Sequence, residues 1–383
     1  MAKNPLFDLS KYGQSVWFDT ISRGLVKSGG LQRLVDDYAV VGVTSNPTIF
    51  DKAISGSADY DDEIRAMAAE GKSAPEIFWK LATDDIRWAC DVLRPIYESS
   101  GHVDGRVSIE VAPDLAHNTA ETASEARRLW QVVDRPNLMI KIPGTAEGVP
   151  AIEAMIYEGL SINVTLLFAV SMHEAVMEAY LKGLERRAAE GKPIDNIFSV
   201  ASFFVSRVDT MVDKELEAKI KAAGDSAEGA KLKGLLGKAA NANAKMAYQA
   251  FKRVFSGPRW EKLREQGANV QRPLWASTST KNPAYPDTMY VAELVGPHTV
   301  NTMPENTVMA FADHGVVRGN TVEEDVAGAE QALTDLAAAG IDMRDVTENR
   351  LVKEGVQSFI DSFDKLLNGL REKTEAITGV TPR

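Results

Sequence analysis

Residues 137–145, NLMIKIPGT, decide how this chain folds and what chemistry it can carry out. Side chains alternate between the two faces of a β-strand, so Leu138, Ile140 and Ile142 share one face and Lys141 lies on the other. This places Lys141 on the inner face of a buried strand. Burial of an ammonium group favours its neutral form and lowers its pKa from about 10.4. A neutral amine is a nucleophile suited to Schiff-base formation with a carbonyl.

A lysine at a strand end also has simpler explanations. Its ammonium group can reach solvent, or it can form a structural ion pair. Other parts of the sequence are needed to distinguish a solvated or ion-paired lysine from a reactive amine.

The composition is that of a globular protein. The chain has 383 residues, 44% hydrophobic and 25% charged, which is enough for one large or two medium domains. A net charge of −11 without a basic run argues against a nucleic-acid or anionic membrane partner. The N-terminus lacks an apolar core of signal-peptide length, and no segment approaches about 18 consecutive apolar residues. We therefore expect a soluble, cytoplasmic protein, in which the one cysteine, Cys90, packs inside a helix.

Strand-like and helix-like patterns alternate from residue 15 to about residue 304. The eight predicted strands are 15–19, 40–46, 107–112, 137–143, 160–166, 196–202, 273–277 and 298–303. Strand and helix repeated eight times predict an α/β protein with a parallel sheet, and the economical closed form is the (β/α)8 or TIM barrel. A doubly wound open sheet is the alternative, but no Gly-x-Gly-x-x-Gly follows the first strand.

We predict a single barrel domain over residues 1–383. Two regions, about 47–105 and 204–270, hold more helical patterns than a simple repeat needs, and we interpret them as helical insertions. The pattern at about 321–375 predicts two C-terminal helices. The final residues, TGVTPR, are expected to form a free tail.

The strand pattern also predicts which polar side chains point into the barrel. Positions that face the helices should be apolar, so polar residues that alternate with them face the lumen. This rule places Glu110 inside the third strand and both Asn163 and Thr165 inside the fifth. The other inward polar residues near strand ends are Asp19, Asn46, Ser202 and Ser277. Because active sites of this fold lie at the carboxyl ends of the strands, the set predicts an active site centred on Lys141.

These residue types allow a narrow chemistry. A neutral lysine adds to a ketone, and acids and bases transfer protons to and from the carbinolamine. The protonated imine then withdraws electrons while an adjacent carbon–carbon bond breaks. This is the chemistry of a class I aldolase. The five histidines show no metal-ligand spacing, so we predict no metal site.

Four segments resemble the signature segments of the transaldolase family. They are GVTSNPTIF, IKIPGTAEG, SINVTLLF and SFFVSRVD, and they occur in this order within roughly residues 15–304. The resemblance implies an enzyme of the non-oxidative pentose phosphate pathway that uses no metal or organic cofactor. In that family a dihydroxyacetone unit passes from sedoheptulose 7-phosphate to glyceraldehyde 3-phosphate, giving erythrose 4-phosphate and fructose 6-phosphate.

The resemblance also implies roles for individual residues. Lys141 resembles the Schiff-base lysine, and Asp19 resembles the carboxylate that takes the proton from the C4 hydroxyl. Glu110 and Thr165 resemble the pair that acts through a water on the carbinolamine. The residues that resemble the substrate-binding set are Asn46, Asn163, Ser202 and the phosphate-binding Arg207.

One segment departs from the better-known branch of the family. That branch has Ala-Ser-x-Arg after the seventh strand, whereas this chain reads ASTSTKNP, with Ser279 in place of a second phosphate-binding arginine. Ser277 still offers a hydroxyl group. Lys281 is the nearest replacement for the missing charge, although a loop lysine is commonly just solvated.

Two alternatives to the transfer of a dihydroxyacetone unit remain open. An enzyme like fructose 6-phosphate aldolase would release free dihydroxyacetone, but those shorter enzymes carry a tyrosine at the position of Glu110. A barrel that only binds sugar phosphates would need no nucleophile. As partners we expect sugar-phosphate substrates, no nucleic acid and no membrane, and we expect a monomer or homodimer.

Overall fold

Eight parallel strands close into a barrel, in chain order, in the computed structural model, which describes residues 4–379. They are β1 (Gln14–Phe18), β2 (Val40–Val43), β3 (Arg106–Glu110), β4 (Leu138–Pro143), β5 (Ile162–Leu167), β6 (Ser199–Phe204), β7 (Gln271–Ala276) and β8 (Thr299–Met303). β1 pairs with both β2 and β8, which closes the ring. The predicted TIM barrel is confirmed, and every predicted strand overlaps an observed one.

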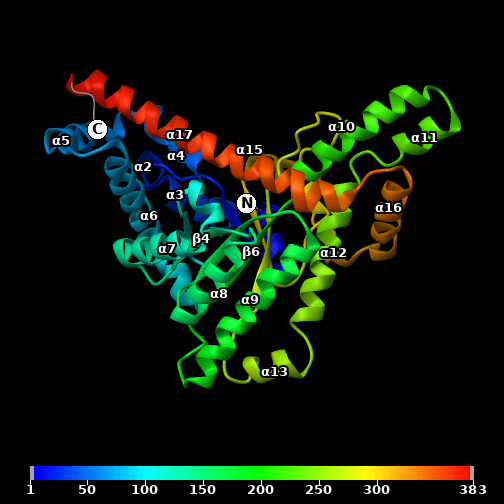
Figure 1. Ribbon diagram of the computed structural model, residues 1–383, viewed down its shortest axis with the longest axis horizontal. Coiled ribbons are helices and arrows are strands. Elements are labelled where there is room, and N and C mark those ends of the chain that lie inside the picture. Colours follow the sequence, from blue (N-terminus) through cyan, green and yellow to red (C-terminus); the bar gives the residue numbers. More distant parts are fainter. Residues whose placement is uncertain (1–3, 380–383) are drawn as a thin grey trace.

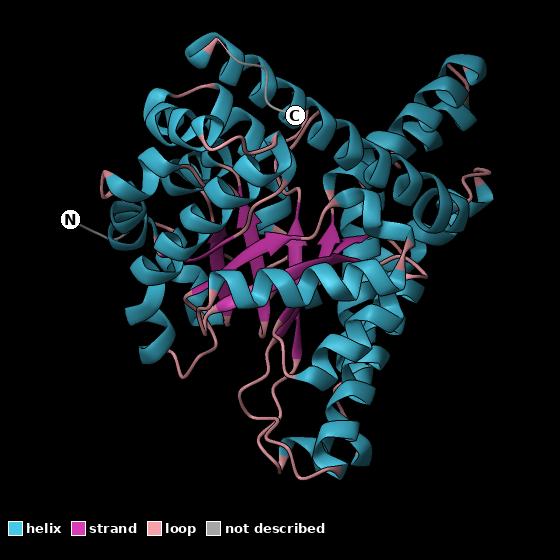
Figure 2. Cartoon of the chain, turned by 60° about the vertical axis from the view of Figure 1, so that its left-hand side comes forward, coloured by secondary structure: helices cyan, strands magenta, loops and turns pink. Residues whose placement is uncertain are grey.

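Helices surround the strands on all sides (Figure 2). Between β1 and β2 lie α2 (Arg23–Lys27) and α3 (Gly30–Tyr38), and short helices α1 (Leu6–Leu9) and η1 (Ser10–Tyr12) precede β1. Single crossings are made by α7 (Thr119–Val133, after the short η3, Pro113–His117), α8 (Gly148–Glu158), α9 (Val170–Ala189) and α14 (Met289–Ala292). Of the strands that these helices cover, β3, β4 and β5 are buried along their whole length.

Two connections contain several helices each. Between β2 and β3 run α4 (Pro47–Ser55), η2 (Ala58–Tyr60), α5 (Asp61–Ala69) and α6 (Ala74–Ser99). Between β6 and β7 run α10 (Ser206–Ala223), α11 (Ala227–Lys233), α12 (Ala239–Val254) and α13 (Pro258–Arg264). In Figure 1, α10 and α11 project at the upper right of the molecule, and α13 lies at the bottom.

After β8 the chain is helical almost to its end. The elements are α15 (Glu305–His314), η4 (Thr321–Glu323), α16 (Val326–Ala338), the π-helical η5 (Asp345–Arg350) and α17 (Leu351–Thr378). Residues 380–383 of the expected tail lie outside the described residues. Within residues 4–379, none of the helices combines the length and the apolar character that a membrane span needs.

The long helix α17 lies across the carboxyl end of the barrel, where Figure 1 shows it spanning the top of the molecule. It packs against β5, η3 and α4. Polar contacts tie it to α4: Lys365 Nζ donates to Asp51 Oδ2 at 2.6 Å, and Thr48 Oγ1 donates to Ser362 Oγ at 2.9 Å. The helix therefore covers the end of the barrel where the predicted polar residues lie.

The backbone leaves the regular strand pattern at the end of β5. Leu166 has a φ of 57°, and the register with β6 shifts between Val164 and Leu167. Leu167 consequently lies beside Val164, both close to Gly144, while Leu166 packs near Gly355 of α17. The regular alternation of side chains in β5 therefore ends at this bulge.

Candidate active site

Lys141 and Glu110 lie side by side inside the barrel. The register of β3 and β4 places the two residues opposite each other, and Lys141 Nζ lies 3.5 Å from Glu110 Oε2. Lys141 Nζ also donates a hydrogen bond to the Ser45 carbonyl at 3.1 Å. Each of the two residues is only 5% exposed. The lysine is thus an inward, buried amine with a carboxyl group as its immediate neighbour.

Glu110 has an unusual electrostatic environment. Both of its carboxyl oxygens are buried and lack a hydrogen-bond partner among the described residues. Burial raises the pKa of Glu110 to about 7, and the attraction of Lys141 only partly opposes this effect. A carboxyl group with a pKa near neutrality is suited to give and to take a proton in the same reaction cycle.

Asp19 directly follows β1, and side chains at the ends of the two neighbouring strands fix its carboxylate through a chain of hydrogen bonds. Thr44 Oγ1 donates to Asp19 Oδ1 at 2.6 Å, and Thr44 Oγ1 and Thr302 Oγ1 are also 2.6 Å apart. Burial raises the pKa of Asp19 above its ordinary value, while the positive charge of Lys141 and the Thr44 hydrogen bond lower it. A second carboxylate therefore lies close enough to Lys141 for the two charges to interact.

A chain of hydrogen bonds crosses the barrel interior on the other side of Lys141. Ser202 Oγ donates to Asn163 Oδ1 at 2.7 Å, and Asn163 Nδ2 donates to Ser108 Oγ at 3.0 Å. Asn163 is next to Lys141 in the register of β4 and β5. Thr165 lies two residues further along β5, opposite Pro143, and its buried Oγ1 has no hydrogen-bond partner within residues 4–379.

A cavity of about 600 Å³ opens over these residues at the carboxyl end of the barrel. The predicted residues that line it are Asp19, Asn46, Lys141, Ser202, Arg207, Ser277 and Lys281. Glu110, Asn163 and Thr165 do not line it. Glu110 and Asn163 are neighbours of Lys141, and Thr165 pairs with Pro143, two residues beyond Lys141 on β4. All ten predicted site residues are therefore found at one end of the barrel.

Asn46 both caps a helix and lines the cavity. It is the N-cap of α4, where its Oδ1 accepts a hydrogen bond from the Ile49 backbone N–H at 3.0 Å. Pro47, at the first helical position, suits this helix start because its missing N–H is not needed there. The cap fixes the side chain at the cavity wall, so capping and a place in the cavity are compatible.

The mouth of the cavity is positively charged. Arg207 lies in the first turn of α10, over the Phe204 ring at 5.6 Å, and Lys281 Nζ donates to Ser279 Oγ at 2.6 Å. Burial of the charged groups lowers the pKa of both cations, and the charge of Arg207 lowers the pKa of Lys281 further. Two cations held near each other attract an anionic group, and a guanidinium is well matched to phosphate oxygens.

Sequence reasoning missed some residues of the cavity. Phe359 of α17 places its ring centroid 6.0 Å from Lys141 Nζ, and Lys52 of α4 also lines the wall. Both belong to amphipathic helices, whose pattern predicts a buried face but does not say which element it faces. The hydrogen bond from Thr44 to Asp19 was not predicted from the sequence either.

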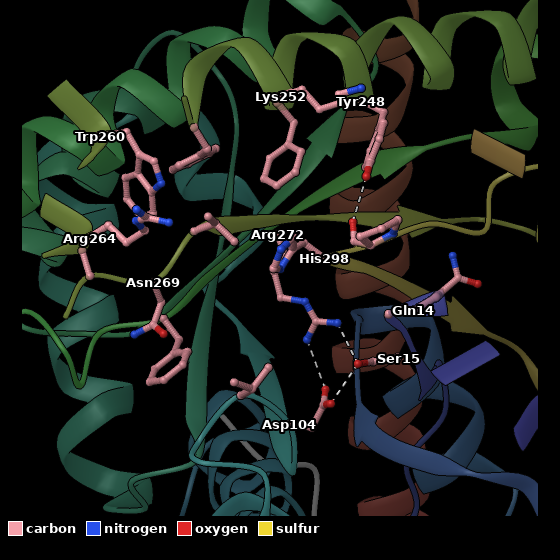
Figure 3. Close-up of a pocket in the computed structure, with 18 of the residues that line it drawn as sticks. Gln14, Ser15, Asp104, Tyr248, Lys252, Trp260, Arg264, Asn269, Arg272 and His298 are labelled. Atoms are coloured by element: carbon pink, nitrogen blue, oxygen red, sulfur yellow. Dashed lines mark hydrogen bonds and ion pairs between the residues drawn. The ribbon is translucent and has the colours of Figure 1, made fainter. Parts of the chain in front are cut away.

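A second cavity, of about 850 Å³, lies at the amino end of the barrel (Figure 3). Aromatic side chains of α12 and α13, such as Tyr248 and Trp260, line one side. On the other side, Arg272 Nη1 pairs with Asp104 Oδ1 at 3.2 Å, and Arg272 Nη2 donates to Ser15 Oγ at 2.7 Å. None of the predicted site residues lies here. Residues at this end of a barrel generally serve stability.

The fold and the site define a class of protein, namely a (β/α)8-barrel enzyme with a buried lysine suited to Schiff-base chemistry. Comparison with known proteins narrows this class. A family profile described as "Transaldolase/Fructose-6-phosphate aldolase" matches residues 16–370, and the chain belongs to this family.

Several relatives are similar over nearly their whole length. A transaldolase of Parafrankia sp. (strain EAN1pec) is 53% identical over 369 residues, which cover 96% of this chain and 98% of the relative. A transaldolase of Acidothermus cellulolyticus is 51% identical, with 97% of each chain covered, and one of Mycobacterium marinum is 51% identical, with 98% and 99% covered. The family supports transaldolase function for this chain, as an enzyme of the transferase class acting on sugar phosphates.

Proposed function

We propose that the chain transfers a dihydroxyacetone unit from sedoheptulose 7-phosphate to glyceraldehyde 3-phosphate through a Schiff base on Lys141. The products would be erythrose 4-phosphate and fructose 6-phosphate, and the reaction belongs to the non-oxidative pentose phosphate pathway. The observation that carries the proposal is the buried Lys141 amine, 3.5 Å from the Glu110 carboxyl group, at the base of a cavity with cations at its mouth.

The first half of the reaction forms the imine. Lys141 Nζ, once neutral, attacks the ketose C2 carbonyl, and the resulting carbinolamine loses water to give the protonated imine. Glu110 supplies and removes the protons, because its pKa of about 7 lets it exist in both forms at neutral pH. Glu110 on β3 and Thr165 on β5 lie on either side of Lys141, and their buried oxygens have no hydrogen-bond partner among the described residues. Oxygens of this kind support proton transfer through a shared water.

The second half breaks and remakes a carbon–carbon bond. Asp19 takes the proton of the C4 hydroxyl, the C3–C4 bond breaks, and its electron pair moves toward the protonated imine. The aldose phosphate leaves, and the enamine on Lys141 attacks the aldehyde carbon of the acceptor. The proton held by Asp19 returns to the new hydroxyl, and water then releases the product ketose from the lysine.

The remaining residues position the substrate. Asn46 and Ser202 line the cavity near Lys141, and Asn163 holds Ser202 through its 2.7 Å hydrogen bond, so these groups are placed to bind sugar hydroxyls. Arg207 and Lys281, with the Ser277 hydroxyl, lie at the mouth and are placed to bind the phosphate. A ketose phosphate has its carbonyl near one end and its phosphate at the other, so one substrate could engage Lys141 and these cations in the same cavity.

Borohydride trapping tests the proposal. With fructose 6-phosphate present, reduction should fix a dihydroxyacetone-derived mass on the peptide that contains Lys141, and Lys141→Ala should remain folded but lose both the adduct and turnover. Lys245→Met is a matched control, because Lys245 is another buried lysine, whose Nζ donates to the Glu324 carbonyl outside the site. An adduct or turnover in Lys141→Ala would overturn the assignment.

A second assay separates transfer from release. Adding erythrose 4-phosphate to enzyme and fructose 6-phosphate should yield sedoheptulose 7-phosphate. Accumulation of free dihydroxyacetone at the same rate with and without the acceptor would instead indicate an aldolase of the fructose 6-phosphate type.

A further inference from the structure

The two cations at the cavity mouth come from different parts of the chain. Arg207 belongs to the first turn of α10, which is a long helix with a regular backbone. Lys281 belongs to the segment between β7 and α14, which contains no helix or strand over residues 277–288. The position of Lys281 relative to Arg207 therefore depends on what attaches this segment to α10.

The segment is attached to α10 at its start. The backbone N–H of Val205 donates to the Ala276 carbonyl at 2.9 Å, and the hydroxyl oxygens of Ser206 and Ser277 are 2.9 Å apart. Both contacts lie directly beside Arg207 in sequence. They fix the end of β7. Further along, Thr278 Oγ1 donates to Asn301 Oδ1 at 2.9 Å and Lys281 Nζ donates to Ser279 Oγ at 2.6 Å, but neither of these contacts joins Lys281 to α10.

Two tyrosine–aspartate hydrogen bonds attach the far end of the segment 277–288 to α10. Tyr285 Oη donates to Asp213 Oδ2 at 2.6 Å, and Tyr290 Oη donates to Asp209 Oδ2 at 2.8 Å. Asp209 and Asp213 are one helical turn apart on α10, so they present their carboxylates on the same face. Lys281 lies between the two attachments, and the segment is thereby held along α10.

The aspartates are themselves fixed by the first turn of α12 and by the loop before it. Asp209 Oδ1 accepts from the Ala240 N–H at 2.7 Å, and Asp213 Oδ1 accepts from the Gly237 N–H at 3.0 Å. Both aspartates are buried, with 1% and 6% exposure. Each carboxylate is therefore held at both oxygens, and removal of one donor leaves a buried acceptor unsatisfied.

Gly237 lets Tyr285 approach this closely. Its φ is 69°, which favours glycine, and a Cβ atom there would lie 2.8 Å from the Tyr285 ring. The tyrosine ring thus fits against the backbone of the loop that fixes Asp213.

We propose that Tyr285 and Tyr290, bonded to Asp213 and Asp209, are positioning residues that hold Lys281 beside Arg207 as one phosphate-binding unit. The inference rests on the proposed function and extends it, because it explains how a flexible lysine serves where a second arginine is absent. Without the tyrosine hydroxyls, the segment would keep its attachment at Ser277 but would sample positions in which Lys281 no longer faces the cavity.

Tyr285→Phe tests this directly. It removes one hydroxyl from a half-buried residue outside the cavity. We expect the KM for fructose 6-phosphate to rise roughly three- to tenfold, as befits one lost hydrogen bond, while kcat stays unchanged. Inhibition by inorganic phosphate should weaken by the same factor. Tyr290→Phe, at the second attachment, should act in the same direction.

Tyr248→Phe is the matched control. Its Oη donates to the Pro297 carbonyl at 3.1 Å, so this substitution also removes one tyrosine hydrogen bond, but at the opposite end of the barrel (Figure 3). It should leave KM and phosphate inhibition unchanged. In a Lys281→Ala background, Tyr285→Phe should add no further rise in KM, because the group that it positions is already gone.

Two results would overturn the inference. One is a Tyr285→Phe enzyme whose KM and phosphate inhibition match those of Tyr248→Phe. The other is a full additional effect in the Lys281→Ala background. Binding of inorganic phosphate, measured by calorimetry on wild-type and Tyr285→Phe protein, tests the positioning role without turnover. A wild type that binds phosphate but transfers no dihydroxyacetone would contradict the proposed function alone.

Discussion

Replacing Glu110 by glutamine should stabilise the protein at pH 8 while slowing its reaction. Burial raises the pKa of Glu110 from its ordinary 4.5 to about 7, a value that already includes the opposing attraction of Lys141. At roughly 1.4 kcal/mol per pKa unit, a difference of this size between the unfolded and folded states corresponds to about 3 kcal/mol.

The sign follows from which state binds the proton more tightly. The folded-state pKa is the higher one, so the contribution of Glu110 to stability is fully present below about pH 4.5 and is lost as the pH rises through 7. Glutamine resembles the protonated carboxyl group and does not ionise. The variant and the wild type should therefore differ by less than about 1 kcal/mol near pH 5, whereas at pH 8 the variant should be more stable by about 3 kcal/mol.

Urea denaturation followed by tryptophan fluorescence at both pH values measures this difference. Glu121→Gln is the matched control, because Glu121 is exposed on α7 and removing its charge relieves no burial. Turnover of Glu110→Gln should fall roughly 10²- to 10⁴-fold, the usual range for loss of a general acid–base. A variant that is less stable than wild type at pH 8, or equally shifted at both pH values, would refute the reasoning.

Two further predictions concern the rest of the site. Asp19→Asn should still form a borohydride-trapped adduct with dihydroxyacetone but should lose carbon–carbon bond cleavage roughly 10²- to 10⁴-fold, which adduct mass and turnover measured together would show. Lys281→Ala should raise the KM for phosphorylated substrates with little change in kcat, and Arg207→Ala should raise it more, because a guanidinium holds two phosphate oxygens. Equal KM values for Lys281→Ala and wild type in steady-state kinetics would leave Lys281 as a solvated loop residue.

Strand alternation predicted the barrel interior well, and the reason is physical. Parallel barrel strands are covered by helices outside, so any polar residue that alternates with apolar ones has only the lumen to face. Glu110, Lys141 and Asn163 occupy adjacent positions in the β3–β4–β5 register, as a common inner face requires. The predicted placement thus depended on a pattern that is local to each strand.

The pattern failed where the backbone stops being extended or where a distant element contributes. Leu166 has a φ of 57° at the end of β5, and alternation no longer predicts the direction of a side chain there. Phe359 could not be placed from sequence, because its helical pattern fits any apolar partner. The tyrosine–aspartate bonds of α10 were equally hidden, since tyrosine and aspartate are ordinary surface residues until the fold buries them.

The position of Phe359 over Lys141 has a consequence for how the enzyme matures. The two residues are far apart along the chain, and such non-local contacts require loop closure before they can form. If the barrel closed before α17 docked, the Lys141 amine would lack the Phe359 ring and would be more open to solvent. Metabolic aldehydes and ketones could then react with it unselectively. Docking of α17, which brings the Phe359 ring to 6.0 Å from Lys141 Nζ, is therefore part of what leaves this lysine only 5% exposed in the finished fold.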